Sequence, residues 1–275
     1  MGQRSIDNSA SDTAVSSGGR AYTVVQISDC HLGSEPGEAL LGMDADHSLA
    51  AVVSLLQHEQ AHIDLLVVSG DMAADASTQA YRRLFPLLNG VAERMVWLPG
   101  NHDDIDTLRQ IVASDVLANR VDLGGWQLLM LDSAVPDQVG GQLRGDQLAL
   151  LADLEPGRPA VVFLHHHLQP IGCQWLDEQR VSNADAFFSQ LPDCVKAVIC
   201  GHVHQASENE HRGVSLLTTP STCIQFKPGS EDFALDDLSP GYRWLRLHPG
   251  GELETGVSRV SGVEFQVDYA ANGYQ

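Results

Sequence analysis

The chain has 275 residues, of which 43% are hydrophobic and 19% charged, as in an ordinary globular protein that buries a sizeable core. Its 36 acidic residues outweigh its 16 lysines and arginines and give a formal charge of −20. A field of this sign argues against a nucleic-acid polymer as partner, whereas a small anionic substrate fits if bound cations invert the local potential.

The cysteines and the N-terminus predict a cytoplasmic protein without membrane contact. Five cysteines occur at wide spacing without a CxxC pair, which suits a reducing compartment. No long apolar run near the N-terminus indicates a signal peptide or an anchor. Residues 1–19 are rich in serine and glycine and are predicted to form a disordered leader. No repeat or interior linker follows, so residues 20–275 are predicted to form a single domain.

In the first half of the chain, short apolar runs alternate with amphipathic stretches. Strands are predicted at Tyr22–Ser28, Asp64–Ser69 and Arg94–Leu98. Helices are predicted between and after them, at Asp46–Gln60, Ser77–Leu88 and near Ile105–Val112. Asp46 and Ser77 are the predicted N-caps of the first two helices.

The second half continues this alternation and then changes to strands and turns. Strands are predicted at Trp126–Leu131, Ala160–Leu164 and Lys196–Cys200, with a helix near Arg144–Leu154. Beyond His204, strands are predicted at Val214–Thr218, Tyr242–Leu247 and Glu252–Val257, the last two joined by a turn at Pro249-Gly250-Gly251. This order suggests an α/β sandwich of sheets flanked by helices.

Histidine, aspartate and asparagine gather where five predicted strands end. In chain order these residues are Asp29 and His31, then Asp71, then Asn101 and His102, then His165, His166 and His167, and finally His202 and His204. In α/β proteins, ligands bind beyond the carboxyl ends of strands, where loops hold polar groups. We therefore expect these side chains to meet in one crevice.

Each of these motifs alone has an ordinary structural explanation. A D-x-H triplet occurs by chance, a Gly-Asp pair is more often a turn or a helix cap, and a histidine run can be a surface feature. Cys30, inside the D-x-H triplet, is interpreted as a small buried hydrophobe. All five motifs together, each at a strand end, predict a dinuclear metal centre.

The pattern D-x-H, G-D, G-N-H-D, H and G-H-x-H resembles the signature of the calcineurin-like metallophosphoesterases, from about Val24 to His204. The resemblance implies a four-layer α/β/β/α sandwich with two mixed β-sheets and a C-terminal β-hairpin region. It implies that one metal is held by Asp29, His31 and His204, a second by Asn101, His165 and His202, and that Asp71 bridges both. His166 is the alternative to His165, because the following proline, Pro170, comes later than in many relatives.

These residue types suit hydrolysis of a phosphodiester. Two divalent ions about 3.5–4 Å apart can clamp phosphate oxygens and turn a bound water into a hydroxide nucleophile. Imidazole, carboxylate and amide ligands without thiolate favour Fe, Mn or Zn over Mg. His102, which the resemblance places beside the substrate, is suited to protonate the departing oxygen, an effect of about 10²–10⁴-fold. Asp75 and Asp103 are the candidate carboxylates to orient its ring.

The substrate is indicated by two C-terminal stretches, Thr219–Gly229 and Pro240–Leu247, which look like those of bacterial class III cyclic-nucleotide phosphodiesterases. This resemblance implies hydrolysis of 3′,5′-cyclic AMP to 5′-AMP, with another small phosphodiester or nucleotide as the alternative substrate. A non-catalytic scaffold is the third hypothesis, although no ligand position is missing. Lys227 and Arg243 could approach the nucleotide or be surface charges. No pattern indicates the oligomeric state.

Overall fold

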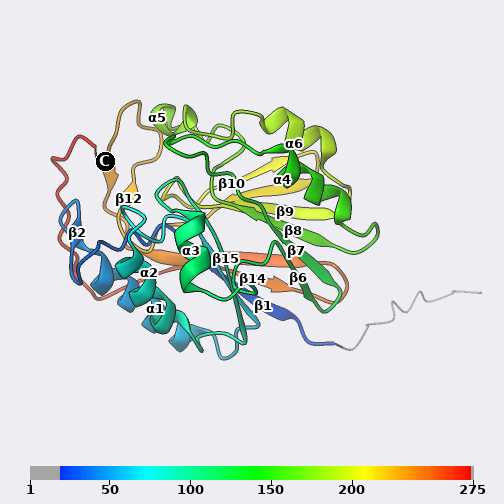
Figure 1. Ribbon diagram of the computed structural model, residues 1–275, viewed down its shortest axis with the longest axis horizontal. Coiled ribbons are helices and arrows are strands. Elements are labelled where there is room, and N and C mark those ends of the chain that lie inside the picture. The colour runs from blue at the N-terminus through cyan, green and yellow to red at the C-terminus, as the bar shows by residue number, and fades with distance from the viewer. Residues whose placement is uncertain (1–18, 274–275) are drawn as a thin grey trace, which may run out of the picture.

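The structure is a computed structural model that describes residues 19–273, and it contains two main sheets (Figure 1). The first has the strand order β15-β14-β1-β4-β5. Its strands are β1 (Tyr22–Ile27), β4 (Leu65–Ser69), β5 (Arg94–Leu98), β14 (Gly241–Leu247) and β15 (Leu253–Arg259). Strands β1, β4 and β5 are parallel, whereas β14 pairs antiparallel with both β1 and β15.

The second sheet has the strand order β10-β11-β9-β8-β7-β6. Its strands are β6 (Arg120–Leu123), β7 (Trp126–Met130), β8 (Ala160–Leu164), β9 (Val195–Cys200), β10 (Glu208–His211) and β11 (Val214–Thr218). The four inner strands are parallel and the two edge strands antiparallel. Two small hairpins pair β2 (Ala39–Leu40) with β3 (Met43–Asp44), and β12 (Gln225–Phe226) with β13 (Leu235–Asp236).

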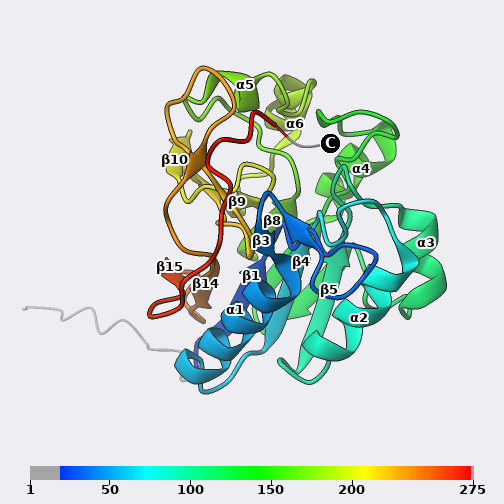
Figure 2. The same cartoon turned by 90° about the vertical axis from the view of Figure 1, so that its left-hand side faces the viewer.

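Helices lie on the outer side of each sheet, and Ala45–Glu59 and Thr78–Leu88 lie at the opposite end of the molecule from Gln174–Asp177 and Ala184–Gln190 in both views (Figures 1 and 2). The helices are α1 (Ala45–Glu59), α2 (Thr78–Leu88), α3 (Ile105–Ile111), α4 (Gly145–Ala149), the 3₁₀ helix η1 (Leu150–Asp153), α5 (Gln174–Asp177) and α6 (Ala184–Gln190). Helices α1 to α3 pack on the first sheet, and α4 and α6 pack on the second.

Three separate apolar cores confirm the predicted four-layer α/β/β/α sandwich. Strand β4 shows how one strand serves two of them, because its side chains alternate between the faces of the sheet. Leu65 and Val67 pack between the two sheets, whereas Leu66 and Val68 pack against the helices of the first sheet. Phe187 of α6 belongs to the third core, on the far side of the second sheet. Burial on both faces explains the continuous apolar runs in the sequence.

Most predicted elements are present, with a few differences at their ends. Ser77 caps α2 as predicted, by accepting a hydrogen bond from the backbone N–H of Ala80. The N-cap of α1 is Asp44, which accepts from the N–H of His47, and Asp46 lies in the first turn, so the prediction of Asp46 as cap was wrong. The predicted helix at 144–154 is divided into α4 and η1.

Among residues 19–273, no helix combines the length and apolar character needed to cross a bilayer. Of the predicted leader, only Gly19 is among the described residues. One domain over residues 20–275 stays a prediction, and the return of β14 and β15 to the sheet of β1 favours it.

Candidate metal centre

The structure brings the predicted site residues together at one edge of the sandwich. Each follows the carboxyl end of a parallel strand: Asp29 and His31 follow β1, Asp71 follows β4, Asn101 and His102 follow β5, His165 follows β8, and His202 and His204 follow β9. Because parallel strands end at the same edge of a sheet, residues far apart in sequence meet there. The carboxylates and most of the imidazoles are at most 5% exposed.

Two groups of potential ligand atoms share this edge. In the first, His204 Nε2 lies 3.2 Å from His31 Nε2 and 3.4 Å from Asp29 Oδ1. In the second, Asp71 Oδ2 lies 3.2 Å from His165 Nε2 and also 3.8 Å from His31 Nε2. The ligand atoms of Asp29, His31 and His204, and those of Asp29, Asp71 and His165, lie within 4.8 Å of one another. Asp71 therefore stands between the two groups, where a bridging carboxylate would be needed.

Asn101 and His202 are the other two predicted ligands of the second metal. The side-chain oxygen of Asn101 is buried and accepts no hydrogen bond within the described part of the chain. His202 Nε2 donates to Oε1 of Gln179 at 3.1 Å, which leaves Nδ1 with a lone pair. Its backbone N–H donates to both carboxylate oxygens of Asp29 at 3.1 Å, so the two groups are also tied through the main chain.

Backbone carbonyls fix the tautomers of two further imidazoles. His165 Nδ1 donates to the carbonyl of Ser69 at 2.8 Å, and His204 Nδ1 donates to the carbonyl of Ile224 at 2.9 Å. A carbonyl can only accept, so in both rings the proton lies on Nδ1 and the lone pair of Nε2 faces the cluster. Partners of this kind orient metal-binding histidines in proteins.

The backbone itself is strained at these positions. Nine described residues other than glycine have positive φ, and five of them are predicted ligands: Asp29 (57°), His31 (47°), Asp71 (48°), His202 (66°) and His204 (47°). A positive φ costs about 1–3 kcal/mol for such residues and clusters at functional sites. Gly70 and Gly100 make the close approach of these loops possible, because a Cβ on either would collide with His165 or Asp71.

The three consecutive histidines have three different environments. His165 faces Asp71. Both nitrogens of the His166 ring are already used, because Nε2 donates to the carbonyl of Val139 at 3.0 Å and Nδ1 accepts from the hydroxyl of Ser133 at 2.9 Å. Its ligand atoms do lie near those of His165 and His202. Since the one lone pair of the ring, on Nδ1, already accepts from Ser133, the hydrogen bonding favours His165 over His166 as a ligand.

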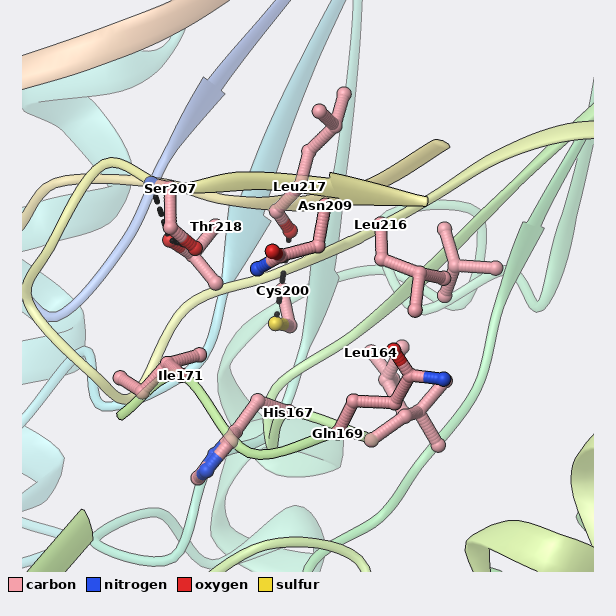
Figure 3. A pocket seen from close by; sticks show the side chains of 12 residues that line it. Leu164, His167, Gln169, Ile171, Cys200, Ser207, Asn209, Leu216, Leu217 and Thr218 are labelled. Atoms are coloured by element: carbon pink, nitrogen blue, oxygen red, sulfur yellow. Dashed lines mark hydrogen bonds between the residues drawn. The ribbon is translucent and has the colours of Figure 1, made fainter. Parts of the chain in front are cut away.

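The His167 ring stacks on that of His202 with centroids 6.1 Å apart, and His167 is also one of the residues around a separate cavity (Figure 3). Leu164, Cys200 and Leu217 also line this cavity, whose volume is about 20 Å³. That is room for about one water molecule, so this cavity does not accept an organic substrate.

Electrostatics test whether the cluster fits metal ions. Asp29 and Asp71 are both buried, and among the described residues their ion-pair partners are histidines only. Buried carboxylates need positive charge nearby. Burial raises the pKa of Asp71, but the charges of His165 and its other histidine neighbours outweigh this and hold that pKa well below its usual value.

The histidines divide the roles of neutral ligand and cation. Burial lowers the pKa of His31 to about 3 and also holds that of His202 well below its usual value, so both rings are neutral and able to bind a metal. For His165, burial is outweighed by Asp71 and Asp29, which raise its pKa to about 9. A proton on His165, or a divalent cation in its place, would supply the positive charge that the buried carboxylates of Asp29 and Asp71 require. Neutral imidazoles, carboxylates and one amide oxygen fit two divalent ions.

His102 lies beside the cluster with its ring oriented by the main chain. Its Nδ1 donates to the carbonyl of Ala74 at 2.9 Å. This carbonyl orients the ring, a role that we expected for the carboxylate of Asp75 or Asp103. The backbone N–H of His102 donates to Asp71 Oδ1 at 2.9 Å. The His102 ring packs edge-on against His31, with centroids 5.1 Å apart.

Asp103 holds the loop that carries Asn101 and His102. Its carboxylate accepts from the backbone N–H groups of Met72, Ala73 and Gly100 and from the hydroxyl of Tyr81 at 2.9 Å. Burial and the nearby charge of Asp71 raise the pKa of Asp103 to about 6. Asp103 therefore ties the loop after β5 to the loop after β4.

The two C-terminal basic residues have no place in the cluster. Arg243 is fully buried, and its Nε and Nη2 donate to the carbonyl of Thr218 at 3.2 and 2.9 Å, which links the two sheets. Lys227 is exposed. Two recesses do reach the cluster: one of about 420 Å³ includes Asn101 and His102, and one of about 450 Å³ includes His204.

Several residues of the site gave no signal in the sequence. Gln179 lies in a polar segment without a motif, and the carbonyls of Ser69, Ala74 and Ile224 could belong to any residue type. The Thr219–Gly229 stretch had been singled out, and the structure gives its local role: the Ser221 hydroxyl donates to the carbonyl of Asp29 at 2.7 Å. Through this bond and the carbonyl of Ile224, this stretch holds Asp29 and His204 in position.

Comparison with known proteins identifies relatives of this arrangement. Residues 22–206 match the family model described as calcineurin-like phosphoesterase. The chain is 44% identical over 257 residues to a 3′,5′-cyclic adenosine monophosphate phosphodiesterase CpdA of Pseudomonas aeruginosa, covering 91% of this chain and 94% of that one. It is 40% identical over 261 residues to the CpdA of Escherichia coli K12, with the same two shares covered.

Solved structures share the fold at low sequence identity. A dimetal phosphatase from Danio rerio superposes with a TM-score of 0.59 and 16% identity, covering 88% of this chain and all of that one. The purple acid phosphatase PPD1 of yellow lupin superposes with a TM-score of 0.62 and 11% identity, covering 90% of this chain and 53% of the other. At these identities the comparison supports the architecture.

Proposed function

The chain belongs to the calcineurin-like phosphoesterase family, and from this premise we propose that it hydrolyses 3′,5′-cyclic AMP to 5′-AMP. The observation that carries the proposal is that all eight predicted site residues follow strand ends at one edge of the sandwich. The relatives named as cyclic AMP phosphodiesterases are matched along most of their length. The reaction adds water across the bond between phosphorus and the 3′ oxygen.

We assign the metal ligands as follows. The first ion would be held by Asp29, His31 and His204 and the second by Asn101, His165 and His202, with Asp71 available to both. When bound, two such ions neutralise the charge on the phosphate and lower the pKa of a water to about 7, which supplies a hydroxide in the cell. The donor set favours Fe, Mn or Zn.

The chain's own residues position the His102 ring and donate a proton to the leaving oxygen. Asp71 fixes the loop of His102 through its contact with that backbone N–H. The bond from His102 Nδ1 to the carbonyl of Ala74 fixes the orientation of the ring and puts the Nδ1 proton on the side away from Nε2. When Nε2 also carries a proton, His102 can give it to the 3′ oxygen as that oxygen leaves phosphorus. The recess beside Asn101 and His102 falls within the size range of small-molecule sites.

The proposal includes the compartment and the partners. The five cysteines are unpaired, which suits the reducing cytoplasm. A chain of formal charge −20 repels nucleic-acid polymers, so the partner we propose is a small cyclic nucleotide.

The test is hydrolysis by purified protein reconstituted with Mn²⁺ or Fe²⁺. We expect cyclic AMP to yield 5′-AMP, and the generic diester bis-p-nitrophenyl phosphate to be cleaved as well. Cleavage of the generic diester alone would keep the two-metal chemistry and reject cyclic AMP as the substrate. Absence of both activities in a metal-loaded protein would reject the enzyme.

A pair of alanine variants tests the choice between His165 and His166. We expect His165→Ala to lose the second metal, because Nε2 of that ring faces Asp71. We expect His166→Ala to keep both metals and to lose about 1–3 kcal/mol of stability, because Ser133 and Val139 lose their buried partner. Metal per chain by mass spectrometry and thermal unfolding separate the two. The opposite pattern would make His166 the ligand.

A further inference from the structure

The second recess at the cluster, next to His204, contains a feature that the proposed hydrolysis leaves unused. The recess has a volume of about 450 Å³, and Gln205, which follows His204 directly, is one of the residues that line it. The recess therefore lies directly beside the predicted ligand His204.

Gln205 is an unusual residue for such a place. It is 5% exposed, and its side-chain nitrogen is enclosed without a hydrogen-bond acceptor among residues 19–273. A buried amide donor is costly to leave without a partner, so its presence points to an acceptor that a ligand brings. The residue is not loosely held, because its backbone carbonyl accepts from the hydroxyl of Thr218 at 2.6 Å.

The recess has firmly packed apolar walls beside two charged residues, Asp236 and Arg259. Phe226 stacks on the His204 ring with centroids 4.1 Å apart and an interplanar angle of 16°. Trp175 packs edge-on against Phe226 at 4.9 Å. Pro228, Val257 and Leu238 extend the apolar wall, and Leu238 is 48% exposed. Apolar walls with a small number of polar groups are typical of sites for organic ligands.

We propose that this recess binds the purine base of the substrate and that Gln205 recognises adenine. The inference rests on the proposed hydrolysis of a cyclic nucleotide. A carboxamide offers one donor and one acceptor side by side, and adenine offers the complementary pair, an amino group beside a ring nitrogen. Gln205 is then a specificity-determining residue that has no part in the chemical step.

The placement suits one small nucleotide. The rings of His102 and His204 each lie 5.1 Å from the His31 ring, so the phosphate at the cluster and a base beside His204 are within one nucleotide's reach. The recess beside His102 suits the base less well, because Asp104, Asp132 and Asp137 line it. Several carboxylates there would repel the adjoining phosphate, whereas the recess beside His204 has one carboxylate, Asp236, and the guanidinium of Arg259.

The test measures base binding separately from cyclic AMP turnover. The metal-loaded enzyme hydrolyses bis-p-nitrophenyl phosphate while 5′-AMP or ribose 5-phosphate is added as inhibitor. The ratio of the two inhibition constants reports the contribution of adenine. We expect Gln205→Leu and Gln205→Glu to reduce the advantage of 5′-AMP about 10- to 100-fold, because neither side chain can donate to a ring nitrogen.

Inhibition by ribose 5-phosphate and turnover of the generic diester should stay unchanged in Gln205→Leu. Gln190→Leu is the matched control, because Gln190 is exposed on α6 and bonds only within its helix. An unchanged advantage of 5′-AMP in the Gln205 variants would overturn the assignment, as would an equal loss of diester turnover, which indicates a structural role. If 5′-AMP inhibits the wild-type protein better than ribose 5-phosphate, the Gln205 variants lose this advantage, and cyclic AMP is not cleaved, the proposed function is rejected and the base site stands.

Discussion

Asp71→Ala should give a folded chain that binds neither metal and cleaves neither cyclic AMP nor bis-p-nitrophenyl phosphate. Asp71 Oδ2 lies 3.2 Å from His165 Nε2 and 3.8 Å from His31 Nε2, between the two ligand groups. Removing this carboxylate removes the negative charge that both sites share. Because bound metals contribute several kcal/mol to the transition state, we expect activity to fall by about 10³-fold or more.

Asp71→Asn is the matched variant for this prediction. It keeps the side-chain volume and an oxygen that can accept from the backbone N–H of His102, a bond that Asp71 makes at 2.9 Å. It loses the charge and one of the two bridging oxygens. Metal content by mass spectrometry and folding by circular dichroism should therefore show a folded protein with depleted metal. Two tightly bound ions in either variant, with activity within about tenfold of wild type, would show that Asp71 is not the bridge.

The position of the site could be predicted from sequence because two simple patterns coincide. Apolar runs such as Leu65–Ser69 mark parallel strands that are buried on both faces, and polar ligand types follow each run directly. Parallel strands of one sheet end at one edge, and because the two sheets stack, Asp29 after the first sheet meets His204 after the second. This reasoning needs only the strand ends, which apolar runs define well.

The orientation of the ligands could not be predicted in this way. Five predicted ligands have positive φ, which is uncommon for residues other than glycine. The residue types at these positions do not by themselves predict that conformation. The tautomers depend on the carbonyls of Ser69 and Ile224, and every residue has a carbonyl. The choice between His165 and His166 likewise depends on Ser133, which lies after a different strand.

The strands that sequence reasoning missed form through pairing. Strand β10 (Glu208–His211) is polar and mostly exposed, and it exists because it pairs with β11 at the edge of the second sheet. Strand β6 has only four residues and pairs antiparallel with β7. Short edge strands have weak local propensity, and tertiary context decides them.

His102→Ala should slow the hydrolysis of cyclic AMP about 10²–10⁴-fold while both metals stay bound. The side chain makes its bond from Nδ1 to the carbonyl of Ala74, whereas the contact with Asp71 comes from the backbone N–H and survives the substitution. The ligand groups are therefore left intact. Turnover under saturating cyclic AMP and metal per chain are the two measurements, and loss of the metals would make His102 a ligand instead of an acid.

The leaving group provides the sharper form of this test. The ribose 3′ oxygen leaves as a strongly basic alkoxide, so it needs a proton, whereas p-nitrophenolate is a far weaker base and leaves without one. If His102 acts as the general acid, His102→Ala must therefore slow cyclic AMP much more than bis-p-nitrophenyl phosphate. An equal loss on both esters would mean that His102 stabilises the phosphate itself. The ratio of the two losses thus separates proton donation from simple binding, because only proton donation depends on the basicity of the departing oxygen.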